Sequence, residues 1–230
     1  MKKISIIIPV YNEKDTLREI ITKVEQTSFC GLEKELIFVD DFSTDGSDEI
    51  LKDYEAKYKV CKHEINLGKG AAIRTALKEV TGDIVVIQDA DLEYDPADYE
   101  KLLPLLIENK ADVVYGSRFL QNQGNGSFML THYLGNKALT LITNVLFNVT
   151  LTDMETCYKA FKTEFIKNVN IVSNRFDFEP EITAKIVKQG ARIKEVPISY
   201  YGRQHAEGKK ITWKDGIHAL KALVKFRFEK

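Results

Sequence analysis

The strongest constraint on the fold is a regular alternation of apolar, β-branched segments with segments of helical spacing. The apolar segments cover 4–10, 35–39, 59–65 and 83–87, and the helical segments cover 15–27, 43–58 and 71–79. Strands that alternate with helices along a chain build βαβ units, whose strands run largely parallel. This half of the chain therefore predicts an α/β fold with a mostly parallel sheet.

The rest of the chain adds both kinds of element, with no internal repeat and no low-complexity linker. We predict a helix over 96–109, a strand over 112–118, an Asn/Gln/Gly-rich loop over 121–127, one or two helices over 128–149, a helix over 179–189 and a strand over 193–199. A basic loop and a C-terminal helix follow. The 230 residues suffice for one large α/β domain or two small ones.

Composition argues against several classes of protein. Charged residues make up 29% of the chain and nearly cancel to a net charge of -1, whereas nucleic-acid-binding proteins normally carry a basic excess. Cys30, Cys61 and Cys157 lie far apart without CxxC spacing, so we expect neither a zinc site nor disulfides, and a cytosolic compartment. No apolar run reaches the roughly 18–20 residues that span a bilayer, so we expect a soluble or peripheral protein.

The sharpest chemical signal is the segment Asp89-Ala90-Asp91-Leu92-Glu93, which directly follows the strand predicted over 83–87. In a parallel sheet, ligands bind beyond the carboxyl ends of the strands. Carboxylates two residues apart at such an end can converge on one hard cation, and Mg²⁺ and Mn²⁺ prefer oxygen ligands. The alternative is a polar loop without a ligand, because a DxD tripeptide is common by chance.

Two further segments lie where a ligand would bind. Asp40 and Asp41 end the second predicted strand, and we expect Asp40 to face the ligand while Asp45 or a neighbour caps the following helix. Lys69 lies between two glycines at a predicted helix start, where the helix N-terminus and the lysine would favour a diphosphate. A plain turn at the helix start is the alternative.

Basic residues in loop-like segments complete the candidates. Arg118, Arg203, Lys209 and Lys210 lie near glycines, and arginine suits bidentate recognition of phosphate. Solvated surface charge is the alternative for each of them. The four histidines show no metal-ligand spacing, and the GxSxG, GxGxxG and GxxxxGK[ST] motifs are absent, which argues against the corresponding hydrolases, dehydrogenases and ATPases.

Taken together, these segments resemble glycosyltransferase family 2, and look most like its branch of dolichyl- and polyprenyl-phosphate sugar synthases. The matching segments are 8–13, 39–46, 66–70, 88–96, 116–119, 152–159, 195–200, 202–203 and 207–210. They cover nearly the whole chain and occur in the family's order. Each segment is weak evidence alone, but the ordered set is strong.

The resemblance implies a GT-A fold, with one domain over 1–230 that has a Rossmann-like nucleotide-sugar half (1–95) and an acceptor half (96–230). It also implies a nucleotide-diphosphate sugar donor, a Mg²⁺ or Mn²⁺ cofactor and inversion at the anomeric carbon. The implied nucleotide-sugar-binding residues are Pro9, Tyr11, Glu13, Asp40, Lys69, Asp89, Ala90 and Asp91. The implied metal ligands are Asp89, Asp91 and Glu93, and the implied phosphate-binding residues are Arg118, Arg203 and Lys209. Some relatives carry Gln at the position of Glu93, where a carboxylate is still a competent oxygen ligand.

Asp153 and Arg118 are the implied catalytic residues. Family members that glycosylate hydroxyl groups use an aspartate near Asp153 as a general base, because an alcohol must lose its proton as it attacks. A polyprenyl phosphate is already anionic near neutral pH and needs no such base. In that case we expect Asp153 to orient groups electrostatically or to bind Arg118 or Lys209.

The reaction that we predict is transfer of a hexose from a GDP-mannose or UDP-glucose type of donor to a polyprenyl or dolichyl phosphate. We expect a cytoplasmic enzyme, peripheral on a membrane face and anchored by a separate membrane partner, without a nucleic-acid partner. Residues that either face the membrane or pack on the sheet are Phe128, Met129, Leu130, Leu139, Leu141 and Leu146, and residues that could touch anionic lipid are Lys221, Lys225, Phe226, Arg227 and Phe228. The alternatives are a transferase acting on a soluble or polysaccharide hydroxyl acceptor, and a non-catalytic sugar-nucleotide-binding subunit.

Overall fold

The computed structural model describes residues 1–120, 130–203 and 213–229. Within these ranges seven strands form one sheet of order β3-β2-β1-β4-β6-β5-β7. The strands are β1 (Lys3–Val10), β2 (Glu33–Asp40), β3 (Lys59–Lys62), β4 (Ile84–Ile87), β5 (Val113–Ser117), β6 (Lys159–Lys162) and β7 (Ile193–Pro197). Strands β1 to β4 are parallel, as the alternation predicts, and β5 is parallel to β7.

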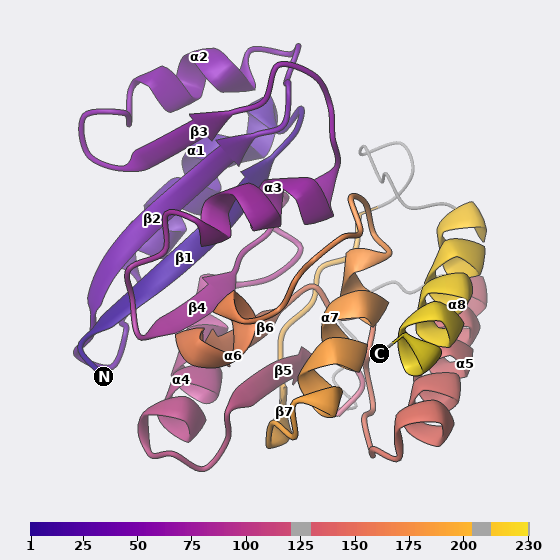
Figure 1. Cartoon of the computed structure of the whole chain (residues 1–230). Coiled ribbons are helices and arrows are strands. Elements are labelled where there is room, and N and C mark those ends of the chain that lie inside the picture. Colours follow the sequence, from indigo (N-terminus) through magenta and orange to yellow (C-terminus); the bar gives the residue numbers. More distant parts are fainter. Residues whose placement is uncertain (121–129, 204–212, 230) are drawn as a thin grey trace.

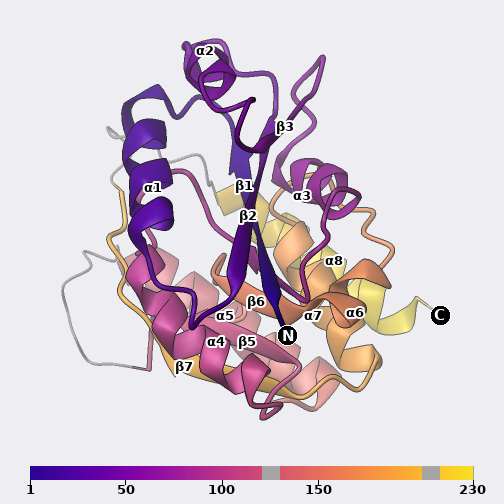
Figure 2. The same ribbon diagram turned by 90° about the vertical axis from the view of Figure 1, so that its left-hand side faces the viewer.

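Helices cover both faces of the sheet, so its central strands are buried on both sides (Figure 1). The helices are α1 (Lys14–Gln26), α2 (Ser47–Lys52), α3 (Lys69–Leu77), α4 (Tyr99–Ile107) after the short 3-10 turn η1 (Pro96–Asp98), α5 (Leu130–Phe147), α6 (Thr163–Lys167), α7 (Phe178–Lys188) and α8 (Trp213–Phe228). Figure 2 shows α1 and α3 on opposite sides of the twisted sheet. Along β1, Ile6 and Ile8 pack into the core under α1 and α4, while Ile7 packs under α3 and α7.

The structure corrects the predicted elements at several points. Strand β6 and helix α6 were not predicted, and β6 runs antiparallel to both of its neighbours, β4 and β5. Strand β6 escaped prediction because it begins and ends with lysines, which are normally exposed to solvent. Here Lys159 and Lys162 are buried, and they pair with Glu179 and Asp112. The helix expected through 58 ends at Lys52, and 53–58 form turns.

The structure describes only part of the region between β5 and β6. The loop expected over 121–127 lies outside the described residues, as does part of the region expected to form one or two helices. The described part of that region is a single helix, α5, beside α8 at one end of the molecule (Figure 1). Among the described helices, none is long and apolar enough to cross a bilayer.

Glu35 ties three segments together at the amino ends of the parallel strands. Its carboxylate accepts hydrogen bonds from the Ser5 hydroxyl and from the Gly82 amide. The amide and the hydroxyl of Thr81 each donate to it as well, both at 2.7 Å. Lys3 pairs with it at 2.6 Å. Although partial burial opposes the charged form, these partners lower the pKa of Glu35 to about 2.

We therefore expect the Glu35→Gln protein to be less stable than the parent chain at neutral pH, by about 1–2 kcal/mol once solvent screening is allowed for. Because the folded-state pKa is the lower one, this stability is present above the ordinary pKa near 4.5 and is lost as the pH falls toward 2. Urea unfolding at a series of pH values measures the difference. The exposed neighbour Glu33, changed to Gln, is the control, and a Glu35→Gln deficit that is constant from neutral to acid pH would contradict the assignment.

Candidate active site

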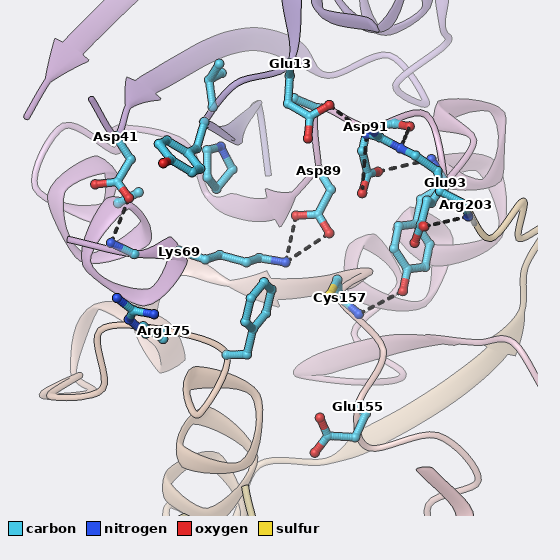
Figure 3. Close-up of a pocket in the computed structure, with 18 of the residues that line it drawn as sticks. Glu13, Asp41, Lys69, Asp89, Asp91, Glu93, Glu155, Cys157, Arg175 and Arg203 are labelled. Carbon is cyan, nitrogen blue, oxygen red and sulfur yellow. Dashed lines mark hydrogen bonds and ion pairs between the residues drawn. The ribbon is translucent and has the colours of Figure 1, made fainter. Parts of the chain in front are cut away.

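One cavity, of about 310 Å³, lies at the carboxyl ends of β1, β2 and β4, where α/β sheets bind their ligands. Residues from the first half of the chain that line it are Pro9, Val10, Tyr11, Glu13, Asp41, Asn66, Gly68, Lys69, Ala72, Asp89, Ala90, Asp91, Glu93 and Tyr94. Residues from the second half are Arg118, Asn136, Glu155, Cys157, Arg175, Phe176, Tyr200 and Arg203. Figure 3 shows Lys69 and Asp89 across its middle, with Glu13 at one end and Glu155 at the other.

Asp41 fixes the loop that leads into α3. Its carboxylate accepts the backbone N–H groups of Leu67 at 2.8 Å and Gly68 at 2.7 Å, and the side-chain amide of Asn66 at 2.9 Å. His63 pairs with the same carboxylate at 2.7 Å. Gly68 has a φ of +98°, and a Cβ there would collide with the carbonyl oxygen of Asn174, so the loop requires glycine.

The residue that we expected to face the ligand on this strand, Asp40, is not among the lining residues. It is buried, and its carboxylate accepts the backbone N–H of Ser43 at 3.1 Å. The structure places the next residue, Asp41, at the cavity wall instead. The N-cap residue of α2 is Gly46, which makes no side-chain cap hydrogen bond, and Asp45 before it accepts hydrogen bonds from the Ser47 amide and hydroxyl.

A chain of buried charges crosses the cavity floor. Lys69 binds the carboxylate of Asp89 at 2.7 Å and lies 3.6 Å from Glu179 of α7, which in turn pairs with the fully buried Lys159. Burial opposes the charged form of Lys69, but the neighbouring carboxylates, Asp89 first, raise its pKa above the ordinary value. A lysine that stays charged beside the cavity supplies a fixed cation for an anionic ligand.

Arg203 contacts three other acidic residues of the cavity, Glu13, Asp91 and Glu93. Its guanidinium donates to Glu13 at 2.7 Å and to the carbonyl oxygen of Asp91 at 2.9 Å, and its backbone N–H donates to Glu93 at 2.8 Å. The hydroxyl of Tyr200 donates to the second oxygen of Glu93 at 2.9 Å. Arg203 therefore joins the segment after β7 to the segments that follow β1 and β4.

The residues present fit a Mg²⁺ or Mn²⁺ ion that also binds the ligand, rather than a preformed metal cage. Within the described residues, no group of three or more His, Cys, Asp or Glu side chains is arranged to hold a metal ion. Asp89 and Asp91 both line the cavity, while Glu93 is engaged by Tyr200 and Arg203. Mg²⁺ is commonly held by one or two carboxylates together with substrate phosphates and water, and this donor set matches that pattern.

Arg118 and Asp153 form a buried ion pair. The Nε and Nη2 atoms of Arg118 each donate to one oxygen of Asp153 at 2.7 Å, and the Arg118 backbone N–H adds a third bond at 3.0 Å. Asp153 is fully buried and does not line the cavity, whereas Arg118 does. The carboxylate of Glu195 accepts hydrogen bonds from the backbone N–H groups of Thr152 and Asp153. Asp153 thus positions the guanidinium that faces the cavity.

The structure brings together most of the residues singled out in the sequence. Those that line the cavity are Pro9, Tyr11, Glu13, Lys69, Asp89, Ala90, Asp91, Glu93, Arg118 and Arg203. Asp40 and Asp153 lie behind its wall, and Lys209 and Lys210 lie outside the described residues. Sequence reasoning assigned no role to Glu155 or Arg175. Glu155 occurs in the segment 152–159 that carries the resemblance, two residues after Asp153, but no sequence signal points to Arg175.

Comparisons with known proteins show the family to which the chain belongs. The model of the family described as "Glycosyl transferase family 2" matches residues 5–169, and the chain therefore belongs to glycosyltransferase family 2 and is an enzyme of that family. An uncharacterized protein of Methanocaldococcus jannaschii is 28% identical over 201 residues, which are 85% of this chain and 80% of that protein. The dolichol-phosphate mannosyltransferase of Pyrococcus furiosus is 28% identical over 211 residues, which are 90% of this chain and 59% of that protein.

A solved structure supports the fold. Glucosyl-3-phosphoglycerate synthase from Mycobacterium tuberculosis, in complex with Mn²⁺, uridine diphosphate and glucosyl-3-phosphoglycerate, superposes with a TM-score of 0.75. The two sequences are 18% identical, and the superposition covers 98% of this chain and 80% of that one. The fold is therefore a GT-A-like α/β fold with a mixed sheet.

The role of Asp41 as the anchor of the 66–68 loop leads to a prediction. In an Asp41→Ala protein several partly buried donors lose their acceptor, at a cost of up to about 1–3 kcal/mol for each group that water does not reach. We expect a lower melting temperature and at least a roughly tenfold weaker affinity for the nucleotide that the parent chain binds best. Calorimetric titration measures the affinity, with Asp15→Ala, an exposed carboxylate of α1, as the control. Unchanged affinity in a folded Asp41→Ala protein would show that the loop does not shape the nucleotide site.

Proposed function

We propose that this family 2 glycosyltransferase transfers a hexose, with inversion, from a nucleotide-diphosphate sugar to the phosphate of a polyprenyl phosphate. The observation that carries the proposal is the complete engagement of Asp153 by Arg118. A carboxylate whose two oxygens are both bound to a guanidinium is poorly placed to remove a proton from an alcohol. An anionic phosphate acceptor needs no such base, and it is attracted by the same guanidinium.

The donor half of the proposal rests on the first half of the cavity. The residues proposed to bind the nucleotide sugar are Pro9, Tyr11, Glu13, Asp40, Lys69, Asp89, Ala90 and Asp91, with Asp40 acting from behind the wall. Lys69 stands at the start of α3, where the helix N-terminus and the ammonium group both favour a diphosphate. A Mg²⁺ or Mn²⁺ ion held by Asp89 and Asp91, with Glu93 nearby, would neutralise charge on the departing nucleoside diphosphate.

Lys69 and Asp89 have to part for such a complex to form, because a metal-binding carboxylate cannot keep both oxygens on an ammonium group. Lys69 lies 3.6 Å from Glu179, so it has a second carboxylate within reach when Asp89 turns to a cation. Arg203, bound to Glu13, Asp91 and Glu93, lies where it can approach a phosphate group. Arg118, Arg203 and Lys209 are the proposed phosphate-binding residues, and Lys209 lies outside the described part of the chain.

The acceptor half of the proposal is supported by apolar side chains exposed on two adjacent helices. Those on α5 are Leu134, Leu141 and Val145, and those on α8 are Ile217, Leu220, Val224 and Phe228. Lys221, Lys225 and Arg227 are exposed beside them. Of the described side chains that we expected to face a membrane, Leu141 and Phe228 are exposed, whereas Leu139 and Leu146 pack against the core and Phe226 is buried. An apolar face flanked by basic residues suits the surface of an anionic membrane, where a polyprenyl phosphate resides.

The chain spans 59% of the length of the dolichol-phosphate mannosyltransferase. We propose a peripheral enzyme at the cytoplasmic face of a membrane, with a separate membrane partner. We also propose the single domain over 1–230, whose nucleotide-sugar half (1–95) carries the carboxylates and whose acceptor half (96–230) carries Arg118. Both halves contribute strands to the one sheet.

The donor site is tested by thermal shift with UDP, GDP and their sugar conjugates, with and without Mn²⁺. We expect stabilisation by nucleotides of one base only, because a ligand at a hundredfold excess over its dissociation constant adds about 2.7 kcal/mol. The shift should vanish in EDTA and in Asp91→Ala, and persist in Glu108→Ala, an exposed carboxylate of the surface. If no nucleotide shifts the melting temperature, the proposed donor site is wrong. Nucleotide binding without any turnover would favour a non-catalytic subunit.

The acceptor is tested with farnesyl phosphate and farnesol as matched probes, presented in vesicles of phosphatidylcholine with phosphatidylglycerol. We expect sugar transfer to farnesyl phosphate alone. Charges placed on the two apolar faces, in the double variant Leu141→Glu/Val224→Glu, should lower vesicle binding and transfer by roughly tenfold or more, because a charge on such a face opposes its insertion.

The control for the membrane surface is Ile65→Glu, because Ile65 is equally exposed but lies far along the chain, between β3 and α3. Transfer to farnesol or to a water-soluble sugar, with farnesyl phosphate inert, would replace the proposed acceptor by a hydroxyl compound. Equal loss in Ile65→Glu would show that the effect is general and does not involve α5 and α8.

A further inference from the structure

Glu155 presents a carboxyl group to the cavity that the proposed reaction has not used. It lies between Asp153 and Cys157 on the segment that leads into β6, and Figure 3 shows it at the end of the cavity away from Glu13. Its Oε1 atom is buried and has no hydrogen-bond partner among the described residues. An ionised carboxylate with an unsatisfied buried oxygen is costly, whereas a neutral carboxyl group in the same place is much less so.

The charges around Glu155 are already balanced without it. The anions that disfavour its ionised form are Glu179 of α7 and Asp153 of its own segment, and the cations that favour it are Lys159 of β6 and Arg118 of the segment after β5. Glu179 is paired with Lys159, and Asp153 with Arg118. An ionised Glu155 would therefore add an unpaired negative charge to a buried set, and a neutral Glu155 leaves that set balanced.

The titration of the group agrees with this geometry. Burial first, and then the charge of Glu179, raise the pKa of Glu155 to about 7, although Lys159 and Arg118 oppose the shift. Asp153, two residues away, has the opposite surroundings, because Arg118 holds both of its oxygens. The two carboxyl groups of one short segment are thus placed in contrasting environments on the two sides of the cavity wall.

We propose that Glu155 is a specificity-determining residue that, as a neutral carboxyl group, donates a hydrogen bond to a non-attacking oxygen of the acceptor phosphate. The proposal rests on the proposed function, because it takes a phosphate as the acceptor. The carboxyl group keeps its proton throughout, so no proton is transferred in this contact. Arg118 supplies the positive charge on the acceptor side and Glu155 supplies a donor without adding charge. Ionisation of Glu155 removes the donor and places a like charge beside the phosphate.

The pH dependence follows in sign from this arrangement. Below a pH of about 7 the carboxyl group is protonated and donates to the phosphate; above it, ionisation opposes binding. Affinity for a phosphate acceptor should therefore fall as the pH rises through and beyond 7, by up to about tenfold per unit. A general base would give the opposite dependence, because a base must be ionised to accept a proton.

The experiment compares the parent chain with Glu155→Gln and Glu155→Ala by calorimetric titration with farnesyl phosphate, at several pH values and in buffers of different ionisation enthalpy. The glutamine keeps a neutral donor, and the alanine does not. We expect the parent chain to lose affinity and to take up protons on binding above pH 7. Above pH 7, where the phosphate of the ligand is itself already almost fully ionised, Glu155→Gln should show neither effect and should outbind the parent by roughly tenfold near pH 8.5, while Glu155→Ala stays weak at every pH.

A second readout does not require a ligand. Because the folded-state pKa of Glu155 is raised, the folded protein binds a proton that the unfolded chain releases, so stability falls as the pH rises from about 4.5 to 7. Glu155→Gln should therefore be more stable than the parent chain at alkaline pH and should lose this advantage in acid. Glu108→Gln, which removes an exposed carboxylate on α4's far end, is the control and should show no such crossover.

The outcomes separate the inference from the proposed function. If the parent chain binds farnesyl phosphate but Glu155→Gln keeps the parent's pH dependence, the inference is overturned and the phosphate acceptor stands. If Glu155→Gln is folded and inactive with an acceptor that the parent chain glycosylates, Glu155 acts as a base and the inference is overturned. If farnesyl phosphate does not bind at any pH while farnesol is glycosylated, the proposed function fails, and the inference fails with it.

Discussion

The buried ionic chain from Asp89 through Lys69 and Glu179 to Lys159 is the interaction on which the cavity depends. It connects the end of β4, the start of α3, the start of α7 and the first residue of β6. Lys159 also donates to the carbonyl oxygens of Met154 and Thr156, so it orders the segment that carries Glu155. Buried charges lose solvation, and such a chain persists only when each charge has a partner. Removing any one of these residues would leave a neighbouring charge buried without a partner. The ionic chain therefore fixes both ends of the cavity.

The parts of the fold that follow a repeating local pattern could be predicted, and the antiparallel insertion could not. Strands β1, β2 and β4 are mostly apolar, so their positions, and the place of the acidic residues that follow Ile87, could be predicted from the local pattern. Strand β6 has buried lysines at both ends, and only their partners Glu179 and Asp112, remote in the sequence, make it a strand. A local pattern holds no information about such partners, which is why β6 and the environment of Glu155 emerged only in three dimensions.

For Asp40 and Asp41, the sequence predicts an acidic strand end but not which of the two side chains lines the cavity. Successive side chains at a strand end point to opposite sides, so a pair of aspartates offers one residue to the ligand side and one to the protein. Both are buried, and the sequence gives no means of choosing between them. The choice depends on the 66–68 loop, whose amides are 2.8 Å and 2.7 Å from Asp41 and which approaches from another βαβ unit. The loop carries Lys69 to Asp89, so the same contact sets the distance between the nucleotide side and the acidic residues.

Two carboxyl groups of the segment 153–157, those of Asp153 and Glu155, bear on the nature of the acceptor. Asp153 lies behind the cavity wall and binds Arg118 through both of its oxygens, whereas Glu155 lines the cavity and its buried Oε1 has no hydrogen-bond partner in the described part of the chain. The two carboxyl groups therefore have different hydrogen-bonding surroundings, although they lie two residues apart. In the proposed reaction, Asp153 orients the cation of Arg118 and Glu155 offers a neutral hydrogen-bond donor, so neither acts as an ionised base. This pair suits the proposed phosphate acceptor, because an acceptor that is already charged needs to be oriented and partly neutralised but not deprotonated.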